Sequence, residues 1–209
     1  MLTITPTGQT LGATVTSVDL SKPLSQADFA QTLQALGEHG VLRFSGQHLS
    51  AGAIRDFSLR FGPIQVGVSE GFRHPDAREV GILSNVVENG KPIGLADAGQ
   101  DWHTDMTYNR VPGFVNVLVA HRVTTRDGRV LGGTEFTNTQ AAYDDLPAGV
   151  KAKLADATAI HDWNFFQEHM RINRGSQRPP LTEAQKAQRP PVRHPVFLTH
   201  PISGRKVIF

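Results

Sequence analysis

The sequence predicts a mixed α+β domain, in which two helices pack outside a β-sandwich or barrel. Two observations support this prediction. In the N-terminal third, two stretches carry apolar residues at helical spacing, and each begins at a serine that can cap a helix. From Val80 onward, short apolar runs are separated by Gly, Pro and Asn, which is typical of short strands joined by irregular loops. The chain of 209 residues has the length of one domain.

The individual elements follow from local patterns. Ser25 is expected to cap the first helix, with Asp28 completing an approximate capping box, and Ser50 is expected to cap the second. Gly37 and Gly40 are expected to end the first helix, and the Gly62-Pro63 pair the second. The predicted elements, in chain order, are strands within residues 2–18, a helix over 25–37, a strand over 41–44, a helix over 50–61, strands over 80–83 and 115–119, a helix over 147–154, and a strand over 207–209.

Residues 166–192 differ from the rest of the chain because they are polar and rich in Arg, Gln and Pro. We expect an insertion or lid over one end of the sheet. Most of the late basic residues lie in or beside this segment, but no aromatic residues alternate with them, so a solvated insertion is favoured over a nucleic-acid surface. These basic residues are Arg171, Arg174, Arg178, Lys186, Arg189 and Arg193.

Composition narrows the classes of function. The chain has no cysteine, so a disulfide framework or a thiolate metal site is excluded, and any metal must be held by His, Asp or Glu. No apolar run reaches about 18 residues and no signal peptide is recognisable, so we expect a cytoplasmic protein without a membrane partner. The formal net charge is only +2, and we expect no nucleic-acid partner. A homo-oligomer is left open.

The most informative motif is Trp102-His103-Thr104-Asp105. In an extended segment, side chains alternate between faces, so His103 and Asp105 point the same way and can bind one metal ion. One imidazole and one carboxylate, completed by a second His from elsewhere, form the metal site of non-haem Fe(II) oxygenases. The tripeptide alone is a weak signal, because a His beside an Asp is more often a surface pair.

Five motifs in order resemble the taurine and chlorophenoxyacetate dioxygenase (TauD/TfdA) family of Fe(II)- and 2-oxoglutarate-dependent enzymes. They cover nearly the whole chain. The motifs are Gly40–Phe44 (GVLRF), Phe61–Pro63 (FGP), Trp102–Asp105 (WHTD), Gly132–Phe136 (GGTEF) with Ala141–Asp144 (AAYD), and His194–Pro195 with Thr199–Lys206 (THPISGRK). The resemblance implies a single domain over residues 1–209 with a double-stranded β-helix (jelly-roll) core and flanking helices.

The resemblance also implies a reaction and its residues. His103 and Asp105 would be two ligands of Fe(II), and the hydroxyl of Thr134 would bind a carboxylate of the co-substrate 2-oxoglutarate. With O2, such an enzyme hydroxylates a small, anionic organic substrate and releases succinate and CO2. Asn85, Tyr108 and Phe165 are candidates to line the substrate pocket, although a core or capping role is at least as plausible for each.

The sequence departs from the family in one respect. The third ligand of the family is a His well downstream of the Thr-His-Pro block, followed by an Arg for 2-oxoglutarate, and this chain has no match for either. His194 and His200 belong to the preceding motif and do not correspond to that ligand.

The chain also stops within an apparent strand at 205–209, so we expect a domain that is incomplete at its C-terminus, with its last strands missing. Two alternatives are a truncated, inactive remnant or partial gene model, and a small-molecule- or metal-binding β-sandwich without redox chemistry.

Overall fold

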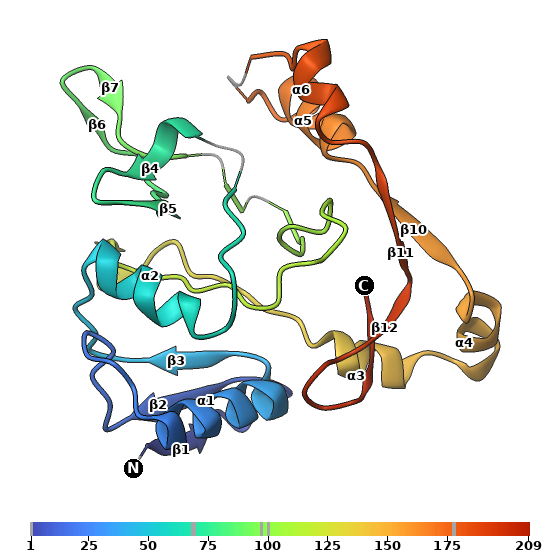
Figure 1. The fold of residues 1–209 in the computed structure, drawn as a ribbon, viewed down its shortest axis with the longest axis horizontal. Coiled ribbons are helices and arrows are strands. Elements are labelled where there is room, and N and C mark those ends of the chain that lie inside the picture. The colour runs from blue at the N-terminus through green and yellow to red at the C-terminus, as the bar shows by residue number, and fades with distance from the viewer. Residues whose placement is uncertain (1, 68–69, 97, 100, 177–178) are drawn as a thin grey trace.

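The computed structural model describes residues 2–67, 70–96, 98–99, 101–176 and 179–209 (Figure 1). Arg178, one of the basic residues of the predicted insertion, lies outside the described residues. Among the described helices, none has the length and apolar character needed to cross a bilayer.

A three-stranded sheet forms the N-terminal part of the fold. It contains β1 (Thr3–Pro6), β2 (Ala13–Thr16) and β3 (Leu42–Phe44) in the order β1-β2-β3. β1 and β2 are antiparallel, whereas β2 and β3 are parallel. The parallel pair needs a long crossover, which α1 (Gln26–His39) provides, packing beside the sheet (Figure 1).

The ends of α1 form as the sequence predicts. The Ser25 hydroxyl oxygen accepts a hydrogen bond from the backbone N–H of Asp28 at 3.0 Å, and the same hydroxyl donates to the Asp28 carboxylate at 2.8 Å. At the other end, Gly40 has a φ of 71° and donates its N–H to the Leu36 carbonyl at 2.8 Å. This left-handed conformation is readily adopted by glycine, so the predicted start at Ser25 and the stop at Gly40 are confirmed, whereas Gly37 lies inside the helix and does not end it.

The second helix, α2 (Ala51–Leu59), joins the N-terminal sheet to the rest of the chain. Ser50 caps it by accepting from the Ala53 N–H at 3.2 Å. Its buried face, Ile54 and Phe57, forms an apolar cluster with Leu20 and Leu49. Val117 and Val119 pack against this cluster from the distant segment that the sequence predicts as a strand. Apolar burial therefore places the central loops on α2.

The remaining strands form short antiparallel pairs. They are β4 (Arg73–His74) with β5 (Ala77–Gly81), β6 (Val87–Glu88) with β7 (Lys91–Pro92), β8 (Thr125–Arg126) with β9 (Arg129–Val130), β10 (Thr158–His161) with β11 (Val192–Pro195), and β12 (Phe197–Thr199) with β13 (Lys206–Ile208). The short helices are η1 (Glu70–Phe72), α3 (Thr139–Asp145), α4 (Ala148–Leu154), α5 (Trp163–Asn173) and α6 (Glu183–Ala187). The predicted strand at the C-terminus and the predicted helix at 147–154 are confirmed by β13 and α4.

Two predictions about the sheet are wrong for the described residues. The expected strand over 115–119 does not form, because no described segment pairs with its backbone, and a strand exists only as part of a ladder. Its valines are instead ordered by side-chain packing on α2. The expected strand over 80–83 ends at Gly81, and Leu83 makes only an isolated bridge to Leu95. The mixed α and β class is confirmed, but the described strands do not close into a jelly roll.

Residues 158–176 and 179–195, named here the α5–α6 arm, run up one side of the molecule (Figure 1). The antiparallel pair β10–β11 forms its base, with His161 opposite Val192 and Ala159 opposite His194. The predicted insertion over 166–192 starts inside α5 and contains α6, so much of its described part is helical. Its role as an insertion or lid stays a prediction.

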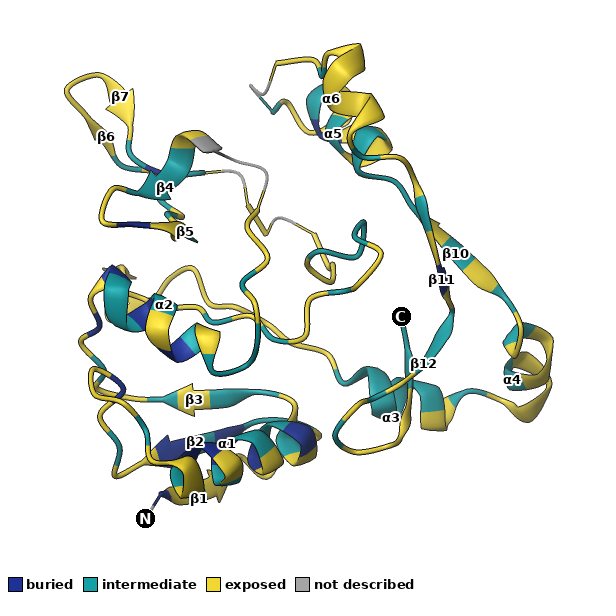
Figure 2. Cartoon of the chain, in the orientation of Figure 1, coloured by how far each residue is buried: buried dark blue, intermediate teal, exposed yellow. Residues whose placement is uncertain are grey.

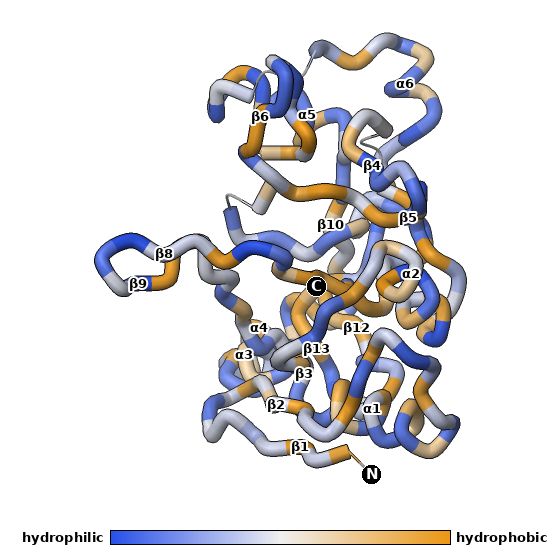
Figure 3. The backbone as a smooth tube through the Cα atoms, turned by 90° about the vertical axis from the view of Figure 1, so that its left-hand side faces the viewer, coloured by the Kyte–Doolittle hydropathy of each residue, from blue (hydrophilic) through white to orange (hydrophobic). Residues whose placement is uncertain are grey.

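Burial is uneven along the chain. Figure 2 shows the buried residues mainly in β2, α1 and α2, whereas the central loops are largely exposed. Figure 3 shows the β8–β9 hairpin projecting from the body. Trp102 is 66% exposed, so it does not pack beneath the metal motif as a large aromatic residue would be expected to do. The central loops that carry the motif must therefore be held by specific polar contacts.

Candidate metal site

The structure brings His103 and Asp105 together in an extended loop. The His103 Nε2 atom lies 3.2 Å from Asp105 Oδ1, and each side chain is about half exposed (52% and 53%). Two ligand atoms at right angles on one metal ion, each about 2.1 Å from it, would be about 3 Å apart. The two side chains therefore have the spacing of a shared metal ion.

The hydrogen bonding of the His103 ring favours metal binding. Its Nδ1 atom lies 2.7 Å from the backbone carbonyl oxygen of Asp101. A carbonyl can only accept, so Nδ1 carries the proton and, in the neutral ring, Nε2 presents a lone pair toward the Asp105 carboxylate. Metal-binding histidines typically have their second nitrogen fixed in this way. Two electron-pair donors this close are stabilised by a cation between them, and a divalent metal ion fits the donor set.

The Asp105 carboxylate is oriented by a residue that the sequence reasoning missed. The Asn116 Nδ2 atom donates to Asp105 Oδ2 at 2.5 Å, so Oδ1 is left to face His103. Asn116 is the one polar residue in the apolar run 114–119. An isolated amide in such a run could have signalled a buried or bonded partner, but nothing local identified Asp105 as that partner.

Neither of the two alternative histidines is available as a third ligand through the nitrogen that makes its hydrogen bonds. His194 Nε2 lies 2.9 Å from the Thr107 carbonyl and 3.0 Å from that of Asn109. His200 Nδ1 accepts from the backbone N–H groups of Ile202 and Ser203 at 3.4 and 3.2 Å, in the turn between β12 and β13. Over the described residues, no group of three or more His, Cys, Asp and Glu side chains is arranged to hold a metal ion.

Tyr108 follows the metal pair in sequence and contacts α5, and its role in a substrate pocket stays a prediction. Its ring centroid is 4.6 Å from that of Trp163 in α5, and its hydroxyl donates to the Met106 sulfur at 3.1 Å. Burial raises the pKa of the Tyr108 phenol, and the nearby Asp105 charge acts in the same direction, while Arg189 opposes it. Tyr108 is thus kept neutral and anchored between the metal loop and the α5–α6 arm.

The other candidate residues are not joined to the metal pair. Thr134 and Asn85 are exposed in loops, and Phe165 is 70% exposed on α5, where it stacks on His169. In the described parts of the chain, no hydrogen bond, ion pair or ring contact connects these three residues to the metal pair. Their roles in binding 2-oxoglutarate or substrate stay predictions.

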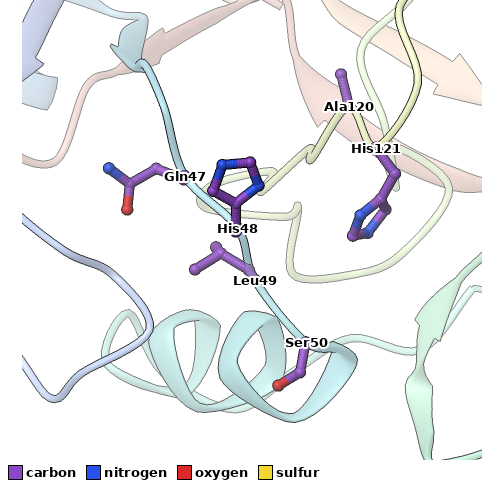
Figure 4. A pocket seen from close by; sticks show the side chains of 6 residues that line it. All are labelled: Gln47, His48, Leu49, Ser50, Ala120 and His121. Carbon is purple, nitrogen blue, oxygen red and sulfur yellow. The ribbon is translucent and has the colours of Figure 1, made fainter.

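Two cavities lie away from the metal pair. One, of about 380 Å³, opens at the start of α2 and contains two histidine side chains (Figure 4). It is lined by Gln47, His48, Leu49, Ser50, Ala120 and His121. The other, of about 360 Å³, lies between α5 and α6. None of the predicted site residues lines either cavity, so cavity shape alone would not have located the metal pair.

Comparison with known sequences identifies relatives along almost the whole chain. The sequence model of the taurine catabolism dioxygenase TauD, TfdA family matches residues 3–209. The chain is 30% identical, over 94% of its length, to an alpha-ketoglutarate-dependent 2,4-dichlorophenoxyacetate dioxygenase of Cupriavidus pinatubonensis, of which it covers 69%. It is 32% identical, over 98% of its length, to an (S)-phenoxypropionate/alpha-ketoglutarate-dioxygenase of Delftia acidovorans, again covering 69% of that relative. The chain thus spans about two thirds of the length of these relatives.

Solved structures show a similar fold. A structure of AAD-2 in complex with Mn(II) and N-oxalylglycine superimposes with a TM-score of 0.67 at 21% identity, covering all of this chain and 68% of the other. A taurine dioxygenase from Burkholderia xenovorans gives a TM-score of 0.64 at 21% identity, covering 99% of this chain and 62% of the other. Since the family's sequence model matches nearly every residue, the chain belongs to the TauD, TfdA family of Fe(II)- and 2-oxoglutarate-dependent dioxygenases, which confirms the family and the cofactors that the motifs predict.

Proposed function

We propose that this chain binds Fe(II) through His103 and Asp105 and takes part in the 2-oxoglutarate-dependent hydroxylation of a small anionic organic substrate. The observation that carries the proposal is the 3.2 Å approach of His103 Nε2 to Asp105 Oδ1, together with the hydrogen bond that places the imidazole proton on the opposite nitrogen. Fe(II) with 2-oxoglutarate supplies the oxidising chemistry, in which O2 is consumed, succinate and CO2 are released, and the substrate gains a hydroxyl group.

The residues of the chain have distinct roles in this proposal. His103 provides a neutral nitrogen ligand, and Asp105 provides an oxygen ligand whose charge offsets part of that of the metal. The Asp101 carbonyl fixes the imidazole tautomer, and Asn116 holds the carboxylate in one orientation. The Thr134 hydroxyl is proposed to donate to a carboxylate of 2-oxoglutarate.

The substrate class is suggested by the names of the relatives. The two dioxygenases compared above are named for 2,4-dichlorophenoxyacetate and phenoxypropionate, which are both aryloxy carboxylates. We propose that an aryloxy acid or a similar small anion is the substrate here. A cytoplasmic location, a homo-oligomer and the absence of nucleic-acid or membrane partners remain expectations from the sequence.

The number of ligands limits the activity expected of these 209 residues. Over the described residues, the metal pair has no third His, Cys, Asp or Glu beside it. Each missing ligand removes a bond and part of the preorganisation of the site, so we expect weak metal affinity and slow turnover from this chain by itself.

Succinate formation tests the proposal. The purified chain would be incubated with Fe(II), ascorbate, 2-oxoglutarate and a panel of aryloxyacetates, aryloxypropionates and sulfonates, beside His103→Ala as control. We expect slow succinate formation that requires His103 and is raised by at least one anion of the panel. Succinate formed equally by both proteins would contradict the proposal. Metal binding that requires His103, without any succinate, would support the alternative of a metal-binding protein without redox chemistry.

A further inference from the structure

We propose that His194 is a positioning residue for the metal site, which holds Asp105 in its ligand orientation by fixing the backbone turn that follows it. This inference rests on the proposed function, because it assumes that Asp105 binds a metal. His194 lies in β11, and its contacts cross 85 and 87 residues of sequence to reach the metal loop.

The backbone turn that follows Asp105 is strained. Met106 has a φ of 59°, a left-handed conformation that residues with a side chain rarely adopt. The turn closes through a hydrogen bond from the Asn109 N–H to the Met106 carbonyl at 3.1 Å. A strained conformation of this kind persists only when the surrounding structure fixes it, and such conformations often occur at functional sites. Something outside the turn must therefore hold it.

The side chain of His194 is itself firmly held by its surroundings. It is only 6% exposed, one of the few buried polar residues among those described. Its ring packs edge-on against the rings of His161 and Phe209, with centroid distances of 5.2 and 5.3 Å, and those two rings are 5.4 Å apart, so the three form one cluster. Its backbone pairs with Ala159 in the β10–β11 ladder. A side chain packed in this way has little rotational freedom, so it can impose a position on what it bonds.

His194 makes hydrogen bonds to this turn at two points. Its Nε2 atom is 2.9 Å from the Thr107 carbonyl oxygen and 3.0 Å from the Asn109 carbonyl oxygen. Both partners can only accept, so Nε2 carries the proton and is shared between them. Thr107 is two residues beyond Asp105, so fixing its carbonyl restricts the backbone from which the carboxylate projects. His194 thus acts on the metal through Asp105 and does not bind it through Nε2.

Other residues of the α5–α6 arm also hold the metal loop in place. On the near side of the motif, Arg174 Nη2 pairs with Asp101 Oδ1 at 2.7 Å, and Asp101 is the residue whose carbonyl orients His103. On the far side, Trp163 packs on Tyr108. The arm therefore contacts the metal loop both before and after the two ligands, and His194 is the one buried polar residue in the described part of the arm.

Three variants separate positioning from packing. His194→Phe keeps a ring in the cluster and removes the donor, whereas His194→Gln keeps an N–H donor at a similar reach. His161→Phe is the matched control, because it changes a ring of the same cluster whose Nε2 atom has no hydrogen-bond partner in the structure. Mn(II) affinity would be measured from the free-ion electron paramagnetic resonance signal, and amide hydrogen exchange of residues 106–109 would be followed in the metal-free protein.

We expect His194→Phe to weaken Mn(II) binding roughly tenfold, at the low end of the range for partners that orient metal ligands, and to speed amide exchange in the turn. His194→Gln should recover most of the affinity, and His161→Phe should keep it. Wild-type affinity and protection in His194→Phe would overturn the inference, as would an equal loss in His161→Phe. If His194→Phe does not fold, His194→Met replaces it with the same expectations.

The two proposals fail in distinguishable ways. If wild type and His103→Ala bind Mn(II) equally, the proposed metal site is wrong and His194 has no ligand to position. If His103 is required for binding but His194→Phe binds as wild type does, only the positioning role is wrong.

Discussion

Replacing Asn116 by Leu should weaken metal binding without disturbing the fold. Leu has nearly the shape of Asn but lacks the amide that donates to Asp105 Oδ2 at 2.5 Å. Without this hydrogen bond, the carboxylate can rotate and Oδ1 is no longer directed at the metal position beside His103. A hydrogen bond to a charged group contributes about 1.5–3 kcal/mol in general.

The exposure of the site sets where in that range the effect should lie. The Asp105 side chain is 53% exposed, so water can replace part of the lost interaction. We therefore expect the lower end, about 1.5 kcal/mol, which corresponds to roughly a tenfold loss of affinity. The assay is a Mn(II) titration followed by the signal of the free ion, with the thermal unfolding midpoint measured in parallel.

A matched control lies on α5. Asn173→Leu also removes an exposed amide, but this amide lies 3.2 Å from His169 Nδ1 and does not touch Asp105. Its Mn(II) affinity should stay within about twofold of wild type, since only the orienting partner of a ligand affects the metal directly. An unchanged affinity in Asn116→Leu, or an equal loss in both variants, would refute the reasoning.

Two further predictions concern stability. In Gly37→Ala, the new Cβ would overlap Ile202 Cγ2, so we expect destabilisation by roughly 1–3 kcal/mol despite the better helix propensity of Ala, whereas Gly52→Ala, with no such contact, should be neutral or stabilising. Thermal melts of the two variants check this, and a more stable Gly37→Ala would contradict it. Burial lowers the pKa of His161 and His200 from the ordinary value of 6.5. As the pH falls below that value, the unfolded chain therefore binds more protons than the folded chain does. The free energy of unfolding should therefore decrease from pH 7 to pH 5, and urea titrations should show a smaller decrease in His161→Phe; an equal slope in both proteins would argue against this origin.

What the sequence predicts well depends on local patterns. Ser25 and Ser50 cap helices because a hydroxyl and the N–H groups of the next turn meet within a few residues. The pairing of His103 and Asp105 follows from alternation in an extended segment, which needs no knowledge of the rest of the fold. The metal pair could therefore be found from the sequence.

The contacts that hold the metal pair could not be found in this way. Asn116 and His194 reach the loop from 11 and about 85 residues away, and no local pattern specifies such partners. The strand expected at 115–119 fails for a related reason, because alternating valines fit a strand but the ladder partner must come from elsewhere. Trp102 is 66% exposed, which shows how little the motif itself contributes to packing.

The central claim is that His103 and Asp105 together hold a divalent metal ion to which 2-oxoglutarate binds. Titrating Mn(II) into wild type, His103→Ala and Asp105→Asn, each with and without 2-oxoglutarate, tests it most directly. We expect both variants to bind at least about tenfold more weakly than wild type, and 2-oxoglutarate to tighten binding only in wild type, because the co-substrate would add its own bonds to a metal ion that the protein already holds. Equal Mn(II) affinities in the three proteins, or a 2-oxoglutarate effect that survives the loss of His103, would contradict the account.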